Sequence, residues 1–347
     1  MNGVKLRVTK MHGLGNNYIY VNEFEETLAE SSLPALAIRL SDVHTGIGSD
    51  GMILIGPSDV ADFRMRIFNA DGSEGRNCGN GLRCVAKYVA DRKMTDKTSF
   101  TIETLGGLME VLVHAETAAA NGGNSRIDGV AVNVDAPQVN GITVSMDAPQ
   151  VNDIAVNMNA SQVNDIAVSM DAPRVNMVTV NMGVPRLNRR DIPMTGEPDS
   201  TAIDEELVMN GNSYRMTAVS MGNPHAVIFV PNVALIPLAD IGPQIECAPL
   251  FPERVNVEFV SVRNERELDF RVWERGSGIT QACGTGACAA VAAGVVNGHL
   301  KQDALVTVHL PGGDLEIVWS STDSCIYMKG PAAFVLEGDF LLDELLQ

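Results

Sequence analysis

Two cysteine motifs repeated at long range constrain the fold of this chain more than any other feature. The strings CGNG at 78–81 and CGTG at 283–286 are each preceded, by the same 12-residue offset, by a string that begins with arginine, RIF at 66–68 and RVW at 271–273. A glycine pair follows the two cysteines by 28 and 29 residues, and an asparagine precedes them by 62 and 60, namely Asn16 and Asn223. Four markers in one order and at nearly one spacing predict an internal duplication, with one CGxG cysteine in each of two pseudo-equivalent domains.

The segments that flank the two cysteines have recognisable local patterns. Apolar and polar residues alternate over 63–70 and 268–274, which is typical of half-buried strands. Helix-compatible residues run from Leu82 onward after Cys78, and an alanine-rich stretch follows Cys283. Each half is therefore predicted to contain a strand, a glycine-rich turn, a cysteine and a helix, in that order.

A repeat array separates the two halves. Five tandem 12-residue units occupy 129–188 and contain no aromatic residue, which accounts for an aromatic content of only 5%. In the first unit Val130, Val132 and Val134 alternate with small or polar residues, which predicts a half-buried strand that ends at an Asp-Ala-Pro turn. Such units either stack as a meander or small solenoid or stay mobile. We expect a structural expansion without catalytic residues, and the related string at 326–331 suggests that one ancestral strand was copied in place.

Composition limits the function classes open to the chain. With 25 basic and 43 acidic residues the formal net charge is −18, which disfavours a nucleic-acid partner. There is no run of 18 apolar residues and no apolar secretion signal near the first residue, so we expect a cytoplasmic protein without a membrane partner. Six cysteines in 347 residues are too few for a disulfide scaffold, and we expect them to be thiols.

The markers divide the chain into four predicted segments. The N-terminal domain with the first cysteine spans 1–128, and the repeats are inserted at its end over 129–188. The C-terminal domain with the second cysteine spans 189–330. The remaining segment, 331–347, is predicted to return to the first domain.

A cysteine at the start of a helix is suited to acid–base chemistry. The free N–H groups of the first helical turn stabilise a thiolate, and they also bind a carboxylate. If the duplication makes Cys78 and Cys283 face one another, a substrate carboxylate would lie between two helix N-termini, with one sulfur on each face of its α-carbon. One thiolate would remove the α-proton while the opposite thiol delivers another. This chemistry inverts the configuration without a metal ion or pyridoxal phosphate.

Other roles for the cysteines remain open from the residues alone. For Cys78 and Cys283, a zinc site is disfavoured because the separations to the next cysteine match no common ligand spacing. A redox disulfide between them is a further alternative, although neither half has a CxxC motif. Buried apolar filler is the expectation for the other four, which are Cys84, Cys247, Cys288 and Cys325.

Two further polar residues are candidates for tuning a thiol. Glu274 follows the second predicted strand and precedes Cys283 by nine residues. His225, in the string GNPH, lies in the second-half counterpart of the Asn16 region. Either residue would act on the pKa of a thiol by charge or by hydrogen bonding.

At these positions the chain resembles the diaminopimelate epimerase family, over nearly all of its length outside the repeats. The motifs that carry the resemblance are MHGLGNN (11–17), FNADGSE (68–74), NCGNGLRC (77–84), SMGNPHAV (220–227), FPERVNVEF (251–259), ERGSGITQACGTGACAA (274–290) and LPGGDLEI (310–317).

The resemblance implies a fold and an activity. The fold is α/β (α+β), with two pseudo-symmetric domains that are each a β-sheet wrapped around a central helix, and here with the repeats inserted in the first half. The activity is the epimerisation of LL-2,6-diaminopimelate to meso-diaminopimelate, for lysine and peptidoglycan synthesis. It needs no cofactor and no metal ion. The implied partners are this small-molecule substrate and a second copy of the chain in a homodimer.

The resemblance also implies roles for individual residues. Cys78 and Cys283 are the acid–base thiols, and His225 and Glu274 modulate them. The reacting carboxylate is bound by backbone N–H groups of Gly79, Asn80, Gly284 and Thr285. The rest of the substrate is contacted by Asn16, Asn69, Asn223, Asn256, Glu274 and Arg275.

The chain departs from the family pattern at three positions. Asn17 stands where the family usually has aspartate, Gly51 where some members have a substrate-contacting glutamine, and Leu336 where some have a tyrosine at the dimer contact. Two other functions remain as alternatives from the sequence. One is the racemisation or epimerisation of another amino acid on the same scaffold, and the other is a catalytically silent, repeat-bearing assembly protein.

Overall fold

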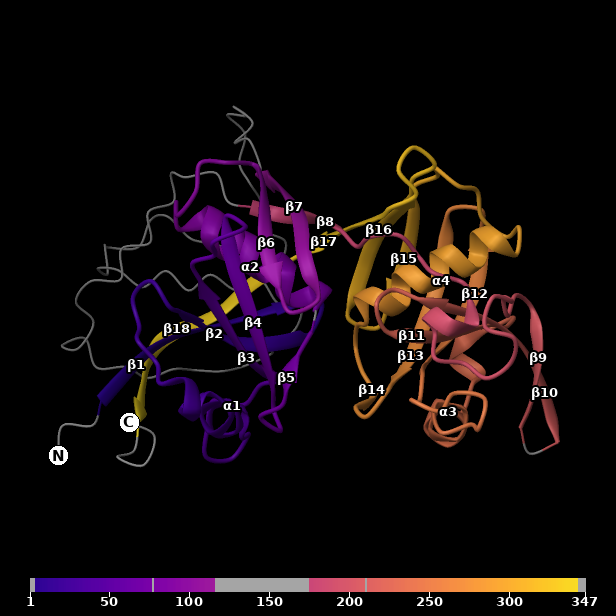
Figure 1. Cartoon of the computed structure of the whole chain (residues 1–347), viewed down its shortest axis with the longest axis horizontal. Helices are drawn as coiled ribbons and strands as arrows, with labels where there is room; N and C mark the ends of the chain where they lie inside the picture. The colour runs from indigo at the N-terminus through magenta and orange to yellow at the C-terminus, as the bar shows by residue number, and fades with distance from the viewer. Residues whose placement is uncertain (1–3, 77, 116–174, 210, 343–347) are drawn as a thin grey trace, which may run out of the picture. The chain divides into compact units, whose positions relative to one another are not determined.

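A computed structural model describes residues 4–76, 78–115, 175–209 and 211–342 (Figure 1). The first repeat unit, its predicted strand and the predicted stacking of the units lie outside the described residues. The described residues before and after the array belong to one unit of structure. None of the helices in these ranges is long and apolar enough to cross a membrane.

Among the described residues, the first half contains nine strands and two α-helices. The strands are β1 (Val4–Gly13), β2 (Asn16–Asn22), β3 (Gly51–Gly56), β4 (Phe63–Asn69), β5 (Glu74–Gly75), β6 (Ser99–Thr104), β7 (Gly107–Ala115), β8 (Val175–Asn181) and β18 (Ala333–Leu342). The α-helices are α1 (Leu33–Ser41) and α2 (Gly79–Asp91), and η1 (Glu30–Ser32) is a short 3-10 helix.

The described residues of the second half form the same numbers of strands and α-helices. Its strands are β9 (Glu205–Met209), β10 (Asn212–Ser220), β11 (Pro224–Phe229), β12 (Asn256–Asn264), β13 (Glu267–Glu274), β14 (Gly278–Ile279), β15 (Val306–Leu310), β16 (Gly313–Trp319) and β17 (Ile326–Pro331). Its α-helices are α3 (Leu238–Glu246) and α4 (Gly284–Val296), and its 3-10 helices are η2 (Arg189–Asp191) and η3 (Val233–Leu235).

The two halves pair their strands in the same order. In the first half the series β1-β2-β3-β4-β6-β7-β8 pairs antiparallel, parallel, antiparallel, parallel, antiparallel and antiparallel. The series β10-β11-β12-β13-β15-β16-β17 follows the same sequence of orientations. The duplication predicted from the cysteine motifs is therefore confirmed.

The halves are joined through one ladder. β8 lies beside β17 (Figure 1) and pairs with it antiparallel. In this ladder Val180 lies opposite Met328. β8 contains the start of the fifth repeat unit, and β17 is the string at 326–331 that resembles one unit. The two related segments thus occupy counterpart positions. β18 leaves the second half and pairs antiparallel with β1 of the first.

Each half surrounds a central helix. In α2 every residue from Gly79 to Val89 is buried, and in α4 the residues from Gly286 to Gly294 are buried. Leu82, Val85 and Val89 are fully enclosed, and each contributes roughly 1.5–3 kcal/mol to folding. A helix with no exposed face has to be covered on all sides, and the strands of each half do this.

The ends of α2 and α4 follow local rules. α2 begins at Gly79, three residues before the predicted start at Leu82, because the Cys78 sulfur acts as the N-cap acceptor. α4 ends at Val296, and Gly298 follows its C-cap with φ +75, a conformation that favours glycine. The glycine pairs of the motif form the turns between β6 and β7 and between β15 and β16.

The four cysteines outside the CGxG motifs were predicted to be buried apolar residues, and this prediction is wrong for one of them. Cys84 and Cys288 are fully buried, in α2 and α4. Cys325 is half-buried. Cys247 is exposed, so the prediction for it was wrong. It caps the C-terminus of α3, beyond the apolar face that this helix buries, so it packs against no core.

Candidate active site

Cys78 is held at the N-terminus of α2. Its sulfur accepts a hydrogen bond from the backbone N–H of Gly81 at 3.3 Å, and it lies 3.5 Å from Oδ1 of Asn16. A side chain at residue 81 would place its Cβ 2.7 Å from the Ile53 side chain, so glycine is needed for this close approach. The N–H groups of Gly79 and Asn80 belong to the same turn and have no partner within the helix.

Cys283 has the corresponding place at α4. Its backbone is extended like that of Cys78, with φ −121 against −144. A Cβ at Gly286 would lie 3.3 Å from the Cys283 sulfur, so the thiol lies over the first turn of the helix. The hydroxyl oxygen of Thr285 is 3.5 Å from the same sulfur. Both predicted cysteine–helix junctions are present.

The two cysteine turns approach one another. Ideal Cβ positions at Gly79 and Gly284 would lie 2.9 and 3.2 Å from the same atom, Cε of Met328. Nδ2 of Asn80 donates a hydrogen bond of 3.3 Å to the carbonyl oxygen of Ala282, the residue before Cys283. One methionine side chain therefore lies against both helix N-termini, and one asparagine links them.

Burial raises the pKa of both thiols, but the surrounding charges differ. At Cys78, burial and the negative charge of Glu274 raise the pKa, and they outweigh the backbone hydrogen bond from Gly81 and the positive charge of Arg83, which lower it. At Cys283, the negative charges of Glu274 and Glu258 act in the same direction as burial, and the pKa lies well above its ordinary value. The duplicated backbone thus gives the two thiols different electrostatic environments.

His225 is fully buried beside a carboxylate. Its Nδ1 lies 2.7 Å from Oε1 of Glu258, and its Nε2 lies 3.0 Å from Oδ1 of Asn223. Nδ2 of Asn223 donates to the Thr285 hydroxyl oxygen at 3.3 Å. Sequence reasoning overlooked Glu258, although a single glutamate in the apolar run NVEFV was a usable signal, because a carboxylate inside an apolar strand needs a partner.

Glu274 lies at the end of β13, near the second thiol. Its carboxylate accepts a hydrogen bond from the Thr280 hydroxyl. Burial raises its pKa, while hydrogen bonds from Thr280 and Cys283 lower it. The structure therefore places Glu274 within hydrogen-bonding reach of Cys283, whereas His225 reaches the same thiol through intermediate side chains.

Asn16 is held by a carboxylate that sequence reasoning did not find. Nδ2 of Asn16 donates to Oδ2 of Asp50 at 2.9 Å, which turns its Oδ1 toward Cys78 and toward Nδ2 of Asn80, at 3.2 Å from the latter. No motif or periodicity in the sequence singled out Asp50, which follows a loop after α1 and precedes β3.

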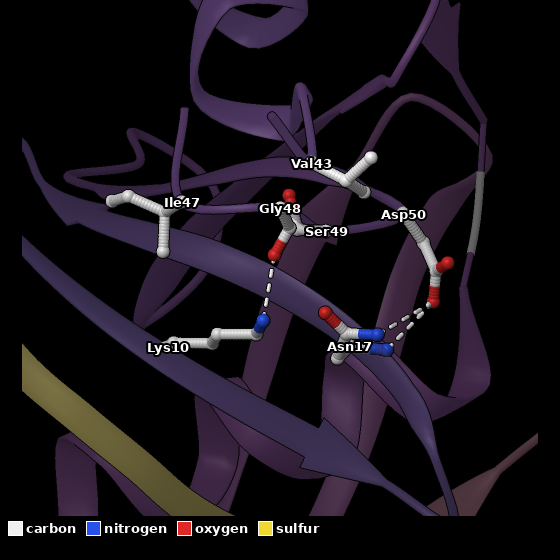
Figure 2. Close-up of a pocket in the computed structure, with 7 residues that line it drawn as sticks. All are labelled: Lys10, Asn17, Val43, Ile47, Gly48, Ser49 and Asp50. Carbon is white, nitrogen blue, oxygen red and sulfur yellow. Dashed lines mark hydrogen bonds between the residues drawn. The ribbon is translucent and has the colours of Figure 1, made fainter. Parts of the chain in front are cut away.

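A pocket of about 330 Å³ is lined in part by Asp50 (Figure 2). Its lining includes Lys10, whose amino group donates to the Gly48 carbonyl, and Asn17, whose backbone N–H donates to Asp50 at 2.7 Å. Neither cysteine lines this pocket. Asn17, at the position where the family usually has aspartate, therefore contacts the pocket and Asp50 rather than a thiol.

The other proposed substrate contacts fall into two groups. Asn256 lies opposite His225 in the sheet, and its Oδ1 accepts a hydrogen bond from the backbone N–H of Arg275 at 2.9 Å. The Arg275 guanidinium donates to the carbonyl of Glu253 at 3.0 Å. Asn69 ends β4 in the first half, and its amide donates to Ser73. The structure thus joins Asn256 and Arg275, and it places Asn69 on the other half.

Gly51 has a structural reason to lack a side chain. It lies opposite Asn69 in the β3–β4 ladder, and a Cβ there would lie 2.2 Å from the backbone oxygen of Phe68 and 2.9 Å from the Tyr18 ring. This backbone does not accommodate the glutamine found in some family members.

Within the described ranges, no group of three or more His, Cys, Asp or Glu side chains is arranged to hold a metal ion. All six cysteines are free thiols in the structure.

The fold defines a class of protein. A crystal structure of a phenazine biosynthesis protein of the PhzF family from Bacillus anthracis matches with a TM-score of 0.60 and 16% identity, and it covers 98% of this chain and 100% of that one. A hydroxyproline epimerase from Agrobacterium vitis, solved with trans-4-hydroxy-L-proline, matches with a TM-score of 0.60 and 13% identity, over 99% and 94% of the two chains. At these identities the likeness concerns the fold, which is the duplicated α/β architecture of two sheet-enclosed helices.

Sequence comparison narrows this class to one family. The family model for diaminopimelate epimerase matches residues 8–127 and 217–335, and the stretch between them holds the repeat array. A diaminopimelate epimerase from Bacillus licheniformis is 49% identical over 336 residues, covering 97% of this chain and 98% of that protein. The chain belongs to the diaminopimelate epimerase family and is an isomerase.

Proposed function

We propose that this protein epimerises LL-diaminopimelate to meso-diaminopimelate with Cys78 and Cys283 as its two acid–base groups. Membership of the family supports the reaction. The observation that carries the assignment of the thiols is their position at the N-caps of counterpart helices, whose first turns are linked by Asn80 and share contact with Met328.

The reacting carboxylate binds at the two helix N-termini. The free backbone N–H groups of Gly79, Asn80, Gly284 and Thr285 supply donors, and the partial positive charges at the two helix ends favour an anion there. The same donors stabilise the negative charge that develops when the α-proton leaves, because they are fixed by the helices before the reaction begins.

Proton transfer then requires the two thiols in opposite states. The thiolate of one cysteine removes the α-proton and becomes a thiol, while the thiol of the other delivers its proton to the opposite face of the α-carbon and becomes a thiolate. The product has the inverted configuration, and the reverse reaction starts from the exchanged protonation states. Glu274 modulates the pKa of the second thiol from hydrogen-bonding distance, and His225 lowers the pKa of Glu274 by charge and so acts on the thiol indirectly.

The second head group of the substrate is bound away from the thiols. Amide and carboxylate oxygens accept from its ammonium, and the Arg275 guanidinium binds its carboxylate. Substrates without this head group would leave these groups unpaired, which penalises them. The proposed contacts are Asn16, Asn69, Asn223, Asn256, Glu274 and Arg275.

The same proposal includes a cytoplasmic homodimer. A biosynthetic enzyme with two catalytic thiols needs a compartment that keeps thiols reduced. On β18 the side chains of Phe334, Val335 and Leu336 are 40%, 52% and 43% exposed, and they form an apolar surface on which a second copy would pack. Light scattering of the purified protein measures the oligomeric state, and cell fractionation measures the location.

The reaction is tested with the reduced protein and LL-diaminopimelate in deuterium oxide. We expect deuterium at the inverted α-carbon, and loss of turnover in both Cys78→Ala and Cys283→Ala. Cys247→Ala is the control, because this cysteine is exposed and outside the site. Full turnover by either of the first two variants would contradict the two-thiol mechanism, and turnover of only other amino acids would contradict the substrate.

A further inference from the structure

A continuous row of polar side chains connects the buried His225 to the Cys283 sulfur. His225 Nε2 lies 3.0 Å from Asn223 Oδ1, Asn223 Nδ2 donates to the Thr285 oxygen at 3.3 Å, and that oxygen lies 3.5 Å from Cys283. At each of these three contacts, a group that can donate a hydrogen bond faces a group that can accept one. The row crosses from β11 to the first turn of α4.

The direction of these hydrogen bonds depends on which ring nitrogen of His225 carries a hydrogen. Its Nδ1 faces Glu258, which is fully buried, at 2.7 Å. With a hydrogen on Nε2, His225 donates to Asn223 Oδ1, and this orients the Asn223 amide so that its nitrogen faces Thr285. Thr285 already accepts this hydrogen bond, so its own hydroxyl hydrogen is available to the Cys283 sulfur.

A hydroxyl group is a suitable hydrogen-bond partner for a sulfur that alternates between thiol and thiolate. It donates to Cys283 when this residue is a thiolate and accepts from it when it is a thiol, since an oxygen has two lone pairs. The counterpart in the first half is different. Cys78 lies 3.5 Å from Oδ1 of Asn16, an oxygen that can only accept. Cys78 also has a hydroxyl partner, the phenol of Tyr18, but that group comes from β2, whereas Thr285 lies on the helix that Cys283 itself caps.

We propose that the Thr285 hydroxyl is a positioning group for Cys283, through which His225 and Asn223 act on this thiol. The inference rests on the function proposed above and extends it, because there Thr285 contributes its backbone N–H group alone. Thr285 donates to the thiolate, and Asn223 keeps the hydroxyl aimed at the sulfur. His225, paired with Glu258, keeps Asn223 in the required orientation.

Other charged groups also face Cys283, and the experiment has to leave them unchanged. They are Glu274 from β13 and Glu258 from β12, and the His225 ring on β11 lies against Glu258. Thr285→Val removes the hydroxyl and leaves these three residues in place. Thr285→Ser keeps the hydroxyl. Thr307→Val, the same change on β15, is the matched control for loss of a threonine hydroxyl in this half.

The rate of Cys283 alkylation by iodoacetamide, followed by peptide mass spectrometry between pH 6 and pH 10, tests the proposal without substrate. We expect Thr285→Val to slow alkylation at pH 7 about tenfold, which corresponds to one pKa unit. Thr285→Ser restores the wild-type pH dependence, and Thr307→Val does not change it. Cys78 alkylation in the same samples stays constant. If Thr285→Val does not fold, Thr285→Ala replaces it with the same expectation.

A double-mutant cycle tests the connection through Asn223. Asn223→Ala alone slows Cys283 alkylation, and it has no further effect in the Thr285→Val background. An unchanged Cys283 rate in Thr285→Val, or an equal effect of Asn223→Ala in both backgrounds, would overturn the proposal. In turnover, kcat of Thr285→Val falls while KM changes less than about twofold, because the backbone N–H group remains. Absence of epimerisation by the wild-type protein would instead contradict the proposed function and leave the alkylation result valid.

Discussion

Asn80, on the first turn of α2, donates a hydrogen bond of 3.3 Å to the backbone oxygen of Ala282, which immediately precedes Cys283. This contact spans the two halves of the duplicated fold at the point where both cysteines are held. Asn80 also donates to Oδ1 of Asn16, the oxygen beside Cys78, at 3.2 Å. A single buried amide therefore fixes the surroundings of both thiols.

Replacement of Asn80 by alanine tests this link. We expect kcat to fall at least about tenfold with a smaller change in KM, because the backbone N–H group remains while the two cysteine turns lose their common partner. Unfolding in urea should show a loss of about 1–3 kcal/mol, since a buried carbonyl oxygen is left unpaired. Asn181→Ala is the control, because this side chain accepts from the Gly183 N–H and its cysteine partner is Cys325, which has no proposed role in the reaction. A kcat within twofold of wild type would contradict the role of Asn80.

Arg83 is fully buried in α2, and its hydrogen-bond partners carry no charge. Its guanidinium donates to the Pro331 oxygen at 3.1 Å and to the Asn80 amide oxygen at 2.8 Å. Its charge lowers the pKa of Cys78. We therefore expect Arg83→Met to raise that pKa and to slow Cys78 alkylation at pH 7 several-fold. The loss of hydrogen bonds to two buried oxygens should cost about 2–4 kcal/mol of unfolding free energy.

Lys87→Met is the control for Arg83→Met. Lys87 is a second buried cation on α2, one turn further on, but it pairs with Asp91. Its replacement should destabilise the protein without changing the alkylation of Cys78. Equal alkylation rates in Arg83→Met and the wild-type protein would show that the guanidinium does not act on the thiol.

The buried thiols outside the site predict how stability depends on pH. Burial raises the pKa of Cys84 from its ordinary value of 9.0 to about 12, and it raises that of Cys288 further. Both stay neutral in the folded state, so their contribution is intact below pH 9 and is lost as the pH rises through 9 to 12. Each thiol accounts for about 1.4 kcal/mol per pH unit over this range. The double variant Cys84→Ala/Cys288→Ala should lose stability less steeply with pH in urea unfolding, and Cys247→Ala should follow the wild-type curve.

We expect that the repeat array can be deleted without loss of folding, because contacts outside the array hold the strands on either side of it. Ala115 of β7 pairs with Val175 of β8. The backbone N–H of Val175 donates to Asp91 at 2.9 Å, and its carbonyl accepts from Lys87, both on α2. Replacement of 116–173 by an Asn-Gly turn should leave kcat within about threefold and the melting temperature within a few degrees.

A longer deletion provides the contrast. Removal of 116–181 also removes β8, which pairs with both β7 and β17, and it should abolish folding. Loss of folding in the shorter deletion would show that the array is part of the stable structure, contrary to the expectation of a structural expansion.

The parts of the site that are encoded in motifs and their spacing could be predicted from the sequence. The order of strand, turn, cysteine and helix in both halves follows from local patterns at 63–70 and 268–274 and from the sequence after each cysteine. The helix start at Gly79 was not predictable from propensity, because glycine is a poor helix former and is accepted there only where Cys78 caps the helix and Ile53 packs close. Asp50 was missed because nothing local to it signals its contact with Asn16, and Arg83 was missed although it follows Asn80 by only three residues.

The sequence alone determined that this protein is a duplicated fold with one cysteine at each of two helix starts, since covalent order and local propensity carry that information. Only the tertiary structure decided how the two thiols differ. Arg83 acts on Cys78, Glu258 and the Thr285 hydroxyl act on Cys283, and the Glu274 charge acts on both. Arg83, Thr285 and Glu274 lie within ten residues of the nearer thiol in the chain, so what the fold adds is their burial beside it and the approach of Glu258 from another strand. The strength of these effects depends on burial, because charges and hydrogen bonds are screened in water and act strongly only where the fold excludes it.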